Sequence, residues 1–194
     1  MSVKLVALEK EEVLRLLEAA KRHGPRAHAM VLLAIRHGLR VSEVTGLRIE
    51  HVNVKEGWIR VERLKGSLTT VQTLERHPGQ PLLDAVRVLG RWLRDRRDDG
   101  SGVLFVSSHG GQMNRSTFAR LWRCLAEAAG LPPVKWHPHV AKHTTGTLLA
   151  HSGASAFLIR QHLGHRSISS SQVYCIVSDR DASAAARAAF IRAF

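Results

Sequence analysis

The spacing of apolar residues changes along the chain, and this change most limits the folds open to it. In residues 9–23, apolar side chains recur every three to four positions, which is the spacing of one helix face. The stretch 57–74, GWIRVERLKGSLTTVQTL, alternates with a period of two instead. Two sets of side chains alternate there: Ile59, Val61 and Arg63 against Trp58, Arg60 and Glu62. This pattern predicts a β-hairpin with its turn near Lys65, and hence a mainly α fold with a small antiparallel β-sheet (α+β).

Helical spacing extends over most of the remaining chain. Besides 9–23, helices are predicted at 26–37, about 81–97, 115–129, 139–151 and 155–163. Gly24-Pro25 ends the first helix. Ser42 is expected to cap a short third helix, with Glu43 in its first turn, where the helix dipole favours an acid. Because no repeat or linker interrupts the pattern, residues 1–178 are predicted to form one domain.

The chain is strongly basic. Lys and Arg number 29 against 16 acidic residues, which gives a formal charge of +13 and a sequence pI of about 11.1. So large a surplus most often accompanies a polyanionic partner, usually nucleic acid. A basic surface with no such partner is the alternative that charge alone leaves open.

Cysteine usage and the N-terminus indicate the compartment. Cys124 and Cys175 lie far apart and form no CxxC pair, which is typical of a reducing environment. The first twenty residues have no apolar core followed by a small-residue cleavage site. No run approaches the about 18 apolar residues that a membrane helix needs. We therefore expect a cytoplasmic protein without a membrane partner.

Two short stretches concentrate side chains that handle protons, metals or phosphates. HPHVAKH, residues 137–143, contains His-x-His-x-x-x-His, a spacing compatible with a metal site or with a phosphate site. Tyr174 is the only tyrosine of the chain and follows His165 in LGHRSISSSQVY. A single tyrosine is usually structural, so its role depends on the residues around it.

Three separated stretches together resemble the signature boxes of the tyrosine recombinase, or phage integrase, family. They are RHGLRVSEVTGLR (36–48), HPHVAKH (137–143) and LGHRSISSSQVY (163–174). They occur in the family's order, with the hairpin lysine between the first two, and the similarity covers about residues 8–178. RHGLR, the RLKGS hairpin and HPH are most similar to the small fimbrial-type DNA invertases. Such proteins lack the N-terminal core-binding domain of larger integrases, and we expect none here.

The resemblance implies the fold of a tyrosine recombinase catalytic domain, which cuts and rejoins DNA without metal or cofactor. Tyr174 would be the nucleophile, leaving a 3′-phosphotyrosine and a free 5′-hydroxyl. Arg40 would clamp the non-bridging phosphate oxygens, for which its fork of donors is suited. Glu43 would orient the site, whether or not it also serves the helix dipole.

Further residues receive roles from the same resemblance. Lys65 would be the general acid that protonates the departing 5′-oxygen. His139 and His165 would hydrogen-bond the phosphate and help move the tyrosine proton. His143 matches a position that faces the interior or supports the site. The second box of most members reads His-x-x-Arg, whereas this chain has Lys142, a point charge that cannot make a bidentate contact.

The resemblance also resolves how HPHVAKH is interpreted. The stretch has no carboxylate nearby in sequence, and a zinc site would need a fourth ligand or an open water held by acids, so no metal is expected. Lys142 leaves the rate of cleavage open. Two alternatives to a recombinase therefore stand: a DNA-binding accessory or regulatory protein on the same fold, and strand passage like that of a type IB topoisomerase.

The partners follow from the same reading. Double-stranded DNA is the expected ligand, bound by a dimer or tetramer of the chain, with DNA-bending proteins as accessory partners. Residues 179–194 are Ala-rich and contain a predicted helix over 181–194, with Phe190 and Phe194 on it. In recombinases of this kind such a segment commonly docks on a neighbouring subunit. Packing on its own domain is the alternative.

Overall fold

The computed structural model describes residues 5–63, 67–175, 183, 186, 187, 190 and 191. The helices before the sheet are α1 (Lys10–His23), α2 (Pro25–His37) and α3 (Val41–Thr45), followed by the 3-10 turn η1 (Ile49–His51). The strands are β1 (Val52–Asn53), β2 (Trp58–Val61) and β3 (Thr70–Thr73). After the sheet come α4 (Ala85–Asp95), α5 (Arg115–Ala128), η2 (Pro133–Lys135), α6 (His139–His151), α7 (Ala156–Leu163) and α8 (Ser169–Gln172). None of the described helices is long and apolar enough to cross a membrane.

Helix α2 is the centre of the fold. Ten of its thirteen residues are buried, and it packs against α1, α3, α4 and α6. Pro25 occupies its first turn, where a missing N–H costs nothing, and Gly38 ends it in the left-handed conformation. The helix therefore carries the chain from the core directly to Arg40, the first predicted site residue.

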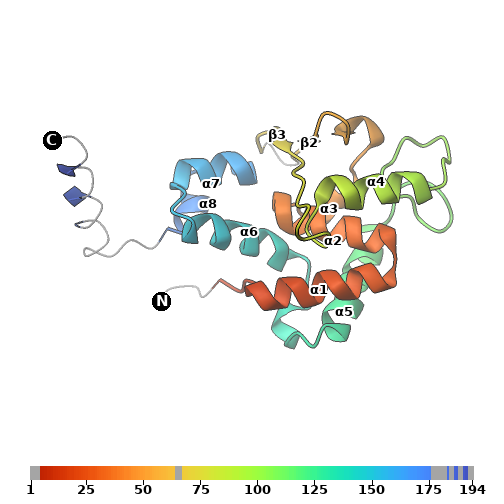
Figure 1. The fold of residues 1–194 in the computed structure, drawn as a ribbon, viewed down its shortest axis with the longest axis horizontal. Coiled ribbons are helices and arrows are strands. Elements are labelled where there is room, and N and C mark those ends of the chain that lie inside the picture. The colour runs from red at the N-terminus through yellow and green to blue at the C-terminus, as the bar shows by residue number, and fades with distance from the viewer. Residues whose placement is uncertain (1–4, 64–66, 176–182, 184–185, 188–189, 192–194) are drawn as a thin grey trace.

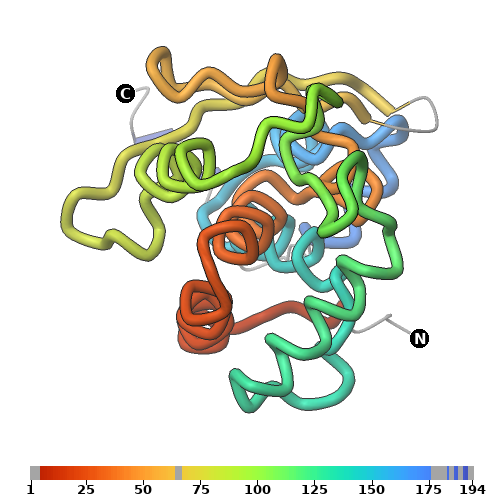
Figure 2. Tube along the Cα trace, turned by 90° about the vertical axis from the view of Figure 1, so that its right-hand side faces the viewer, coloured from red at the N-terminus to blue at the C-terminus, as the bar shows by residue number. Residues whose placement is uncertain are grey.

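The sheet is a three-stranded antiparallel meander, in which β2 lies between β1 and β3. Ile59 pairs with Val52 on one side and with Gln72 on the other. The sheet lies on the opposite side of the body from α1 and α5 (Figures 1 and 2). The antiparallel pairing of β2 with β3 confirms the predicted hairpin, and Ile59 and Val61 are its buried side chains.

The second and third signature boxes, residues 137–143 and 163–174, lie in the second half of the chain. Helices α6, α7 and α8 succeed one another at one end of the molecule, with α7 against both α6 and β3 (Figure 1). Ser155 caps α7 by accepting a hydrogen bond from the Leu158 amide. The third box, which starts at the end of α7, therefore begins beside the hairpin, where the Leu68 amide donates to the Gly164 carbonyl.

Some boundaries differ from those predicted. Ser42 does not cap α3: the helix begins at Val41, Arg40 is the residue before it, and Glu43 accepts the Arg40 amide. Helix α4 is shorter than predicted because Asp84, not a residue near 81, caps it and accepts the Arg87 amide.

Two predicted features lie wholly or largely outside the described residues. Lys65 belongs to the undescribed stretch 64–66, so its place relative to the site stays a prediction. Of the predicted tail helix, the described residues are Ser183, Ala186, Arg187, Phe190 and Ile191, and these are helical and exposed.

Candidate active site

Arg40 is held at both ends by one carboxylate. Glu43 Oε2 accepts a hydrogen bond from the Arg40 amide at 2.8 Å, and Oε1 accepts one from Nη1 at 2.9 Å. The Glu43 side chain is fully buried, whereas that of Arg40 is 37% exposed. Glu43 therefore fixes the guanidinium from behind and leaves its outer edge available to a ligand.

Arg63, which sequence reasoning left without a role, is buried at the centre of the site. Its Nη1 donates to Glu43 Oε2 at 2.8 Å and to the Gly38 carbonyl at 3.1 Å. Its Nη2 donates to the carbonyls of His37 at 3.0 Å and His162 at 2.9 Å. One guanidinium thus joins the end of β2, the first box and the end of α7.

Charge balance around Glu43 depends on this arginine. Burial alone would raise the pKa of Glu43, but the charges of Arg63 and Lys142 and the Arg40 amide lower it below its ordinary value. Glu43 is therefore ionised at neutral pH, as a hydrogen-bond acceptor for two guanidinium groups must be.

Lys142 points into the protein. It is 2% exposed, and its Nζ donates to the Leu163 carbonyl at 2.8 Å. Burial, followed by the charges of Arg63 and Arg40, lowers the pKa of Lys142 to about 7, although Glu43 opposes the shift. Lys142 therefore supports the end of α7, and its ammonium releases its proton more readily than that of an exposed lysine.

His165 is positioned by the left-handed Gly164 just before it. A side chain at Gly164 would lie 2.7 Å from Arg63 Cγ and 2.8 Å from the Leu68 carbonyl, so glycine lets α7 approach the hairpin. His165 is buried, and its Nδ1 lies 2.8 Å from Ser171 Oγ. Burial and the charges of Lys142, Arg40 and Arg63 lower its pKa to about 4.

Tyr174 lies against α6. A Cβ on Gly146 would come within 2.5 Å of the tyrosine ring, so the glycine makes room for it. The ring of His165 stacks on that of Tyr174, with centroids 6.4 Å apart and planes 12° apart. Burial raises the pKa of Tyr174 to about 12, against the opposing charge of Arg40. The hydroxyl therefore keeps its proton until a ligand changes its surroundings.

The histidines of HPHVAKH do not converge on one point. His137 and His139 are exposed, and the ring of His139 meets that of His143 edge to face, with centroids 4.4 Å apart. His143 Nδ1 lies 3.0 Å from the Tyr174 hydroxyl. Among the described residues no group of three His, Cys, Asp or Glu side chains could hold a metal ion.

The structure brings together most of the predicted site residues. These are Arg40, Glu43, His139, Lys142, His143, His165 and Tyr174, with Arg63 added. The sequence did contain a signal for Arg63, because it follows Ile59 and Val61 at a spacing of two and so shares their face of the extended chain. Several cations surround one carboxylate here, so the site is suited to an anion.

Comparison with known proteins identifies related chains. The sequence model of the phage integrase family matches residues 7–180. The type 1 fimbriae regulatory protein FimE of Escherichia coli K12 is 34% identical over 149 residues, which are 75% of this chain and 71% of FimE. The tyrosine recombinase XerA of Pyrococcus furiosus is 33% identical over 172 residues, which are 89% of this chain and 57% of XerA.

Solved structures extend the likeness to three dimensions. A crystal structure of XerA recombinase superposes with a TM-score of 0.75 at 31% identity, over 92% of this chain and 61% of that one. The XerH site-specific recombinase, in a pre-cleavage complex with its difH substrate, has a TM-score of 0.79 over 95% of this chain. Its identity of 22% supports the fold alone. With a family model over most of its length and relatives above 30% identity, the chain belongs to the phage integrase family.

Proposed function

We propose that the protein is a site-specific recombinase that cuts and rejoins double-stranded DNA through a 3′-phosphotyrosine intermediate, in an inversion or in integration and excision. The observation that carries the proposal is the meeting of three separated stretches around one hydroxyl. The charge of Arg40 acts on Tyr174, the ring of His165 lies parallel to the tyrosine ring, and His143 hydrogen-bonds the hydroxyl. A nucleophile beside fixed cations is what reversible phosphoryl transfer requires.

The chemistry assigns each side chain a task. Tyr174 Oη forms a bond to the scissile phosphorus, and the bond from phosphorus to the 5′-oxygen breaks. Arg40 binds the non-bridging oxygens, whose negative charge increases in the transition state. Lys65, from the hairpin, delivers a proton to the departing 5′-oxygen, and His139 and His165 hydrogen-bond the phosphate. Rejoining runs the same steps backwards, so no bond energy is lost.

Lys142 has a supporting task in this proposal. Its ammonium, held on the Leu163 carbonyl, adds positive charge behind the phosphate without contacting it from the open side. Arg40 is then the one arginine that binds the non-bridging phosphate oxygens in this proposal. Cleavage should therefore be slower than at a site where two exposed arginines bind them.

A nicked suicide substrate tests the proposal, because loss of a short 5′ fragment traps the covalent protein–DNA adduct. The wild type should accumulate adduct, and Tyr174→Phe should form none while binding DNA with nearly the same affinity. A DNA-binding regulator would yield no adduct with either protein. A type IB topoisomerase would yield adduct and relax a plasmid with no recombination sites, whereas a recombinase should join two sites into a recombinant product.

DNA binding itself is expected from the charge. With a formal charge of +13, affinity should fall steeply with salt, at a log–log slope near −0.9 for each phosphate neutralised. A flat salt response would contradict DNA as the partner. Inside the cell we place the protein in the cytoplasm and on the nucleoid, with DNA-bending proteins as accessory factors.

Assembly on DNA is supported by a groove on the surface. It has a volume of about 850 Å³ and lies between α1, α2, β3, α6 and α7. Most of its lining is apolar, and Leu148 and Leu158 on its walls are 50% and 63% exposed. Phe190 and Ile191 of the tail are 67% and 66% exposed. We propose that the tail of a neighbouring subunit buries these residues in the groove, in a dimer or tetramer on DNA.

Deleting residues 182–194 tests this assembly. The truncated protein should bind one DNA site and form adduct normally, but should require higher concentration to occupy two sites together. Gel-shift stoichiometry on a two-site fragment measures the difference. Unchanged cooperative assembly would mean that the tail packs on its own domain.

A further inference from the structure

The hydroxyl of Tyr174 has a hydrogen-bond partner that the family resemblance did not supply. His143 Nδ1 lies 3.0 Å from Tyr174 Oη. His143 and Gly146 are three residues apart on α6 and so share one face of the helix. Gly146 makes room for the tyrosine ring, and His143 meets its oxygen. Together they form a seat for the nucleophile.

The other basic groups nearby are engaged elsewhere. His165 Nδ1 lies 2.8 Å from Ser171 Oγ, and its ring stacks on the tyrosine face. His139 lies edge to face against His143, one ring further from the hydroxyl. Lys142 donates to the Leu163 carbonyl. Within the described part of the chain, His143 is therefore the group with a nitrogen at hydrogen-bond distance from the attacking oxygen.

We propose that His143 is the base that takes the phenolic proton when Tyr174 attacks the phosphorus. This rests on the proposed recombinase function. The proton moves from Oη to Nδ1 as the bond between oxygen and phosphorus forms, and the general acid protonates the departing 5′-oxygen. On rejoining, the 5′-hydroxyl attacks, and the His143 imidazolium returns its proton to the tyrosine oxygen. Neither direction needs an outside reagent.

The electrostatics around His143 keep it neutral beforehand. Burial, followed by the charges of His139, His137 and Lys142, lowers the pKa of His143 to about 4, so its ring is free to accept a proton at neutral pH. Arg40 also reaches Tyr174 from the side of α3. A DNA phosphate would offset these positive charges and raise the affinity of the imidazole for a proton. The base would then strengthen when substrate binds.

The single tyrosine makes a selective test available. Growth of a tyrosine auxotroph on 3-fluorotyrosine replaces only residue 174, and the fluorinated phenol loses its proton more readily. His143→Gln should slow adduct formation on the nicked substrate by about 100-fold or more, a typical loss for a proton-transfer group. Fluorotyrosine should speed the His143→Gln protein by a larger factor than it speeds the wild type. His151→Gln, an exposed change on the same helix, should leave the rate unchanged.

The outcomes separate the two proposals. If His143→Gln cleaves at the wild-type rate, His143 is not the base, and the recombinase function stands. If the variant is slow but gains from fluorotyrosine by the same factor as the wild type, His143 only positions Tyr174, and the base assignment is overturned. If the wild type forms no adduct at all, the proposed function fails, and this inference fails with it. DNA affinity and thermal unfolding of each variant confirm that it is folded.

Discussion

Replacing Arg63 by methionine should destabilise the protein more than any comparable change on the hairpin. The guanidinium makes four hydrogen bonds, three to main-chain carbonyls and one to Glu43, and both side chains of that ion pair are fully buried. Removing one partner of a buried pair costs about 3–5 kcal/mol, because the other charge stays buried and uncompensated. Lysine has three donors instead of five, so Arg63→Lys must leave at least one acceptor unpaired, at about 1–3 kcal/mol.

Urea unfolding followed by circular dichroism measures these losses. With a slope of about 2–3 kcal/mol/M, Arg63→Met should lower the midpoint by about 1–2.5 M. Arg60→Met is the matched control, because Arg60 lies on β2 only three residues before Arg63, is 43% exposed and pairs with Glu62 at 3.5 Å. Its loss should be under about 1 kcal/mol.

The two Arg63 variants also separate stability from function. Arg63→Lys should remain folded yet form adduct more slowly, because Glu43 loses its second guanidinium and holds Arg40 less firmly. Equal midpoints for Arg63→Met and Arg60→Met would refute the reasoning. So would a folded Arg63→Lys protein that cleaves at the wild-type rate.

Three further predictions address other parts of the site. Gly146→Ala should displace Tyr174, since the new Cβ would lie 2.5 Å from its ring, and should reduce adduct formation. Gly90→Ala, whose nearest neighbour would be 3.7 Å away, should leave the rate unchanged, and equal rates for both would be contrary to the seat described for the tyrosine. Folding lowers the pKa of Lys142 from 10.5 to about 7. Between these pH values the folded state binds fewer protons than the unfolded state, so the free energy of unfolding increases as the pH rises. Lys142→Met should therefore stabilise the free protein most below pH 7 and progressively less towards pH 10.5, as thermal melts at several pH values would measure, and a pH-independent difference would contradict this. Cleavage should survive EDTA, because the cations at the phosphate are side chains; loss of activity restored by zinc or magnesium would revive a metal site.

The helices were predictable where local pattern decides them. The prediction for 139–151 coincides with α6, and that for 26–37 misses only Pro25 of α2. The cap of α3 was not predictable from Ser42, because the acceptor that fixes this turn is the side chain of Glu43, held in place by Arg63. A contact from Arg63, twenty residues away in the sequence, outweighed the local preference.

The sequence predicted which residues lie in the site but not how their side chains contact one another. Similarity to known boxes grouped Arg40, Lys142, His165 and Tyr174, and these lie together. The orientation of Lys142 towards Leu163 depends on how α6 packs on α7. The hydrogen bond between His143 and Tyr174 depends on how the third box packs on α6. The local spacing of apolar residues predicts neither of these two packing arrangements. Arg63 could have been found, since an arginine in phase with buried Ile59 and Val61 needs partners inside the protein.

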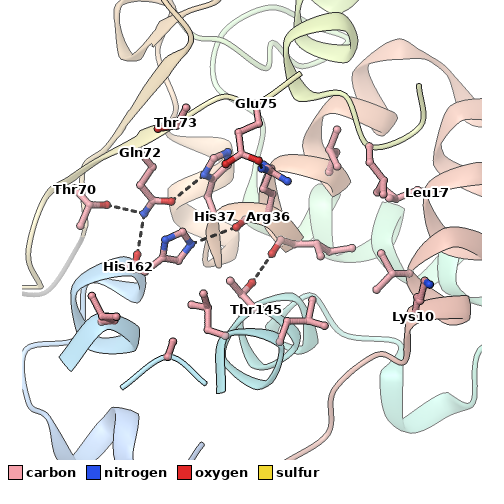
Figure 3. Close-up of a pocket in the computed structure, with 18 of the residues that line it drawn as sticks. Lys10, Leu17, Arg36, His37, Thr70, Gln72, Thr73, Glu75, Thr145 and His162 are labelled. Atoms are coloured by element: carbon pink, nitrogen blue, oxygen red, sulfur yellow. Dashed lines mark hydrogen bonds and ion pairs between the residues drawn. The ribbon is translucent and has the colours of Figure 1, made fainter. Parts of the chain in front are cut away.

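The carbonyl of His162 is shared between two parts of the molecule. On the side of the active site, Arg63 Nη2 donates a hydrogen bond of 2.9 Å to this carbonyl. On the side of the groove, Gln72 Nε2 donates one of 2.8 Å. Gln72 also contacts the ring of His37 (Figure 3). Arg63 donates to the main-chain carbonyl of the same histidine. The groove and the candidate active site thus share the His162 carbonyl as a common acceptor. If a segment docks in the groove and shifts Gln72, we expect the contacts of Arg63 to change, and with them the affinity of the proposed site for DNA. By thermodynamic reciprocity, DNA must then change the affinity of the groove for that segment by the same factor.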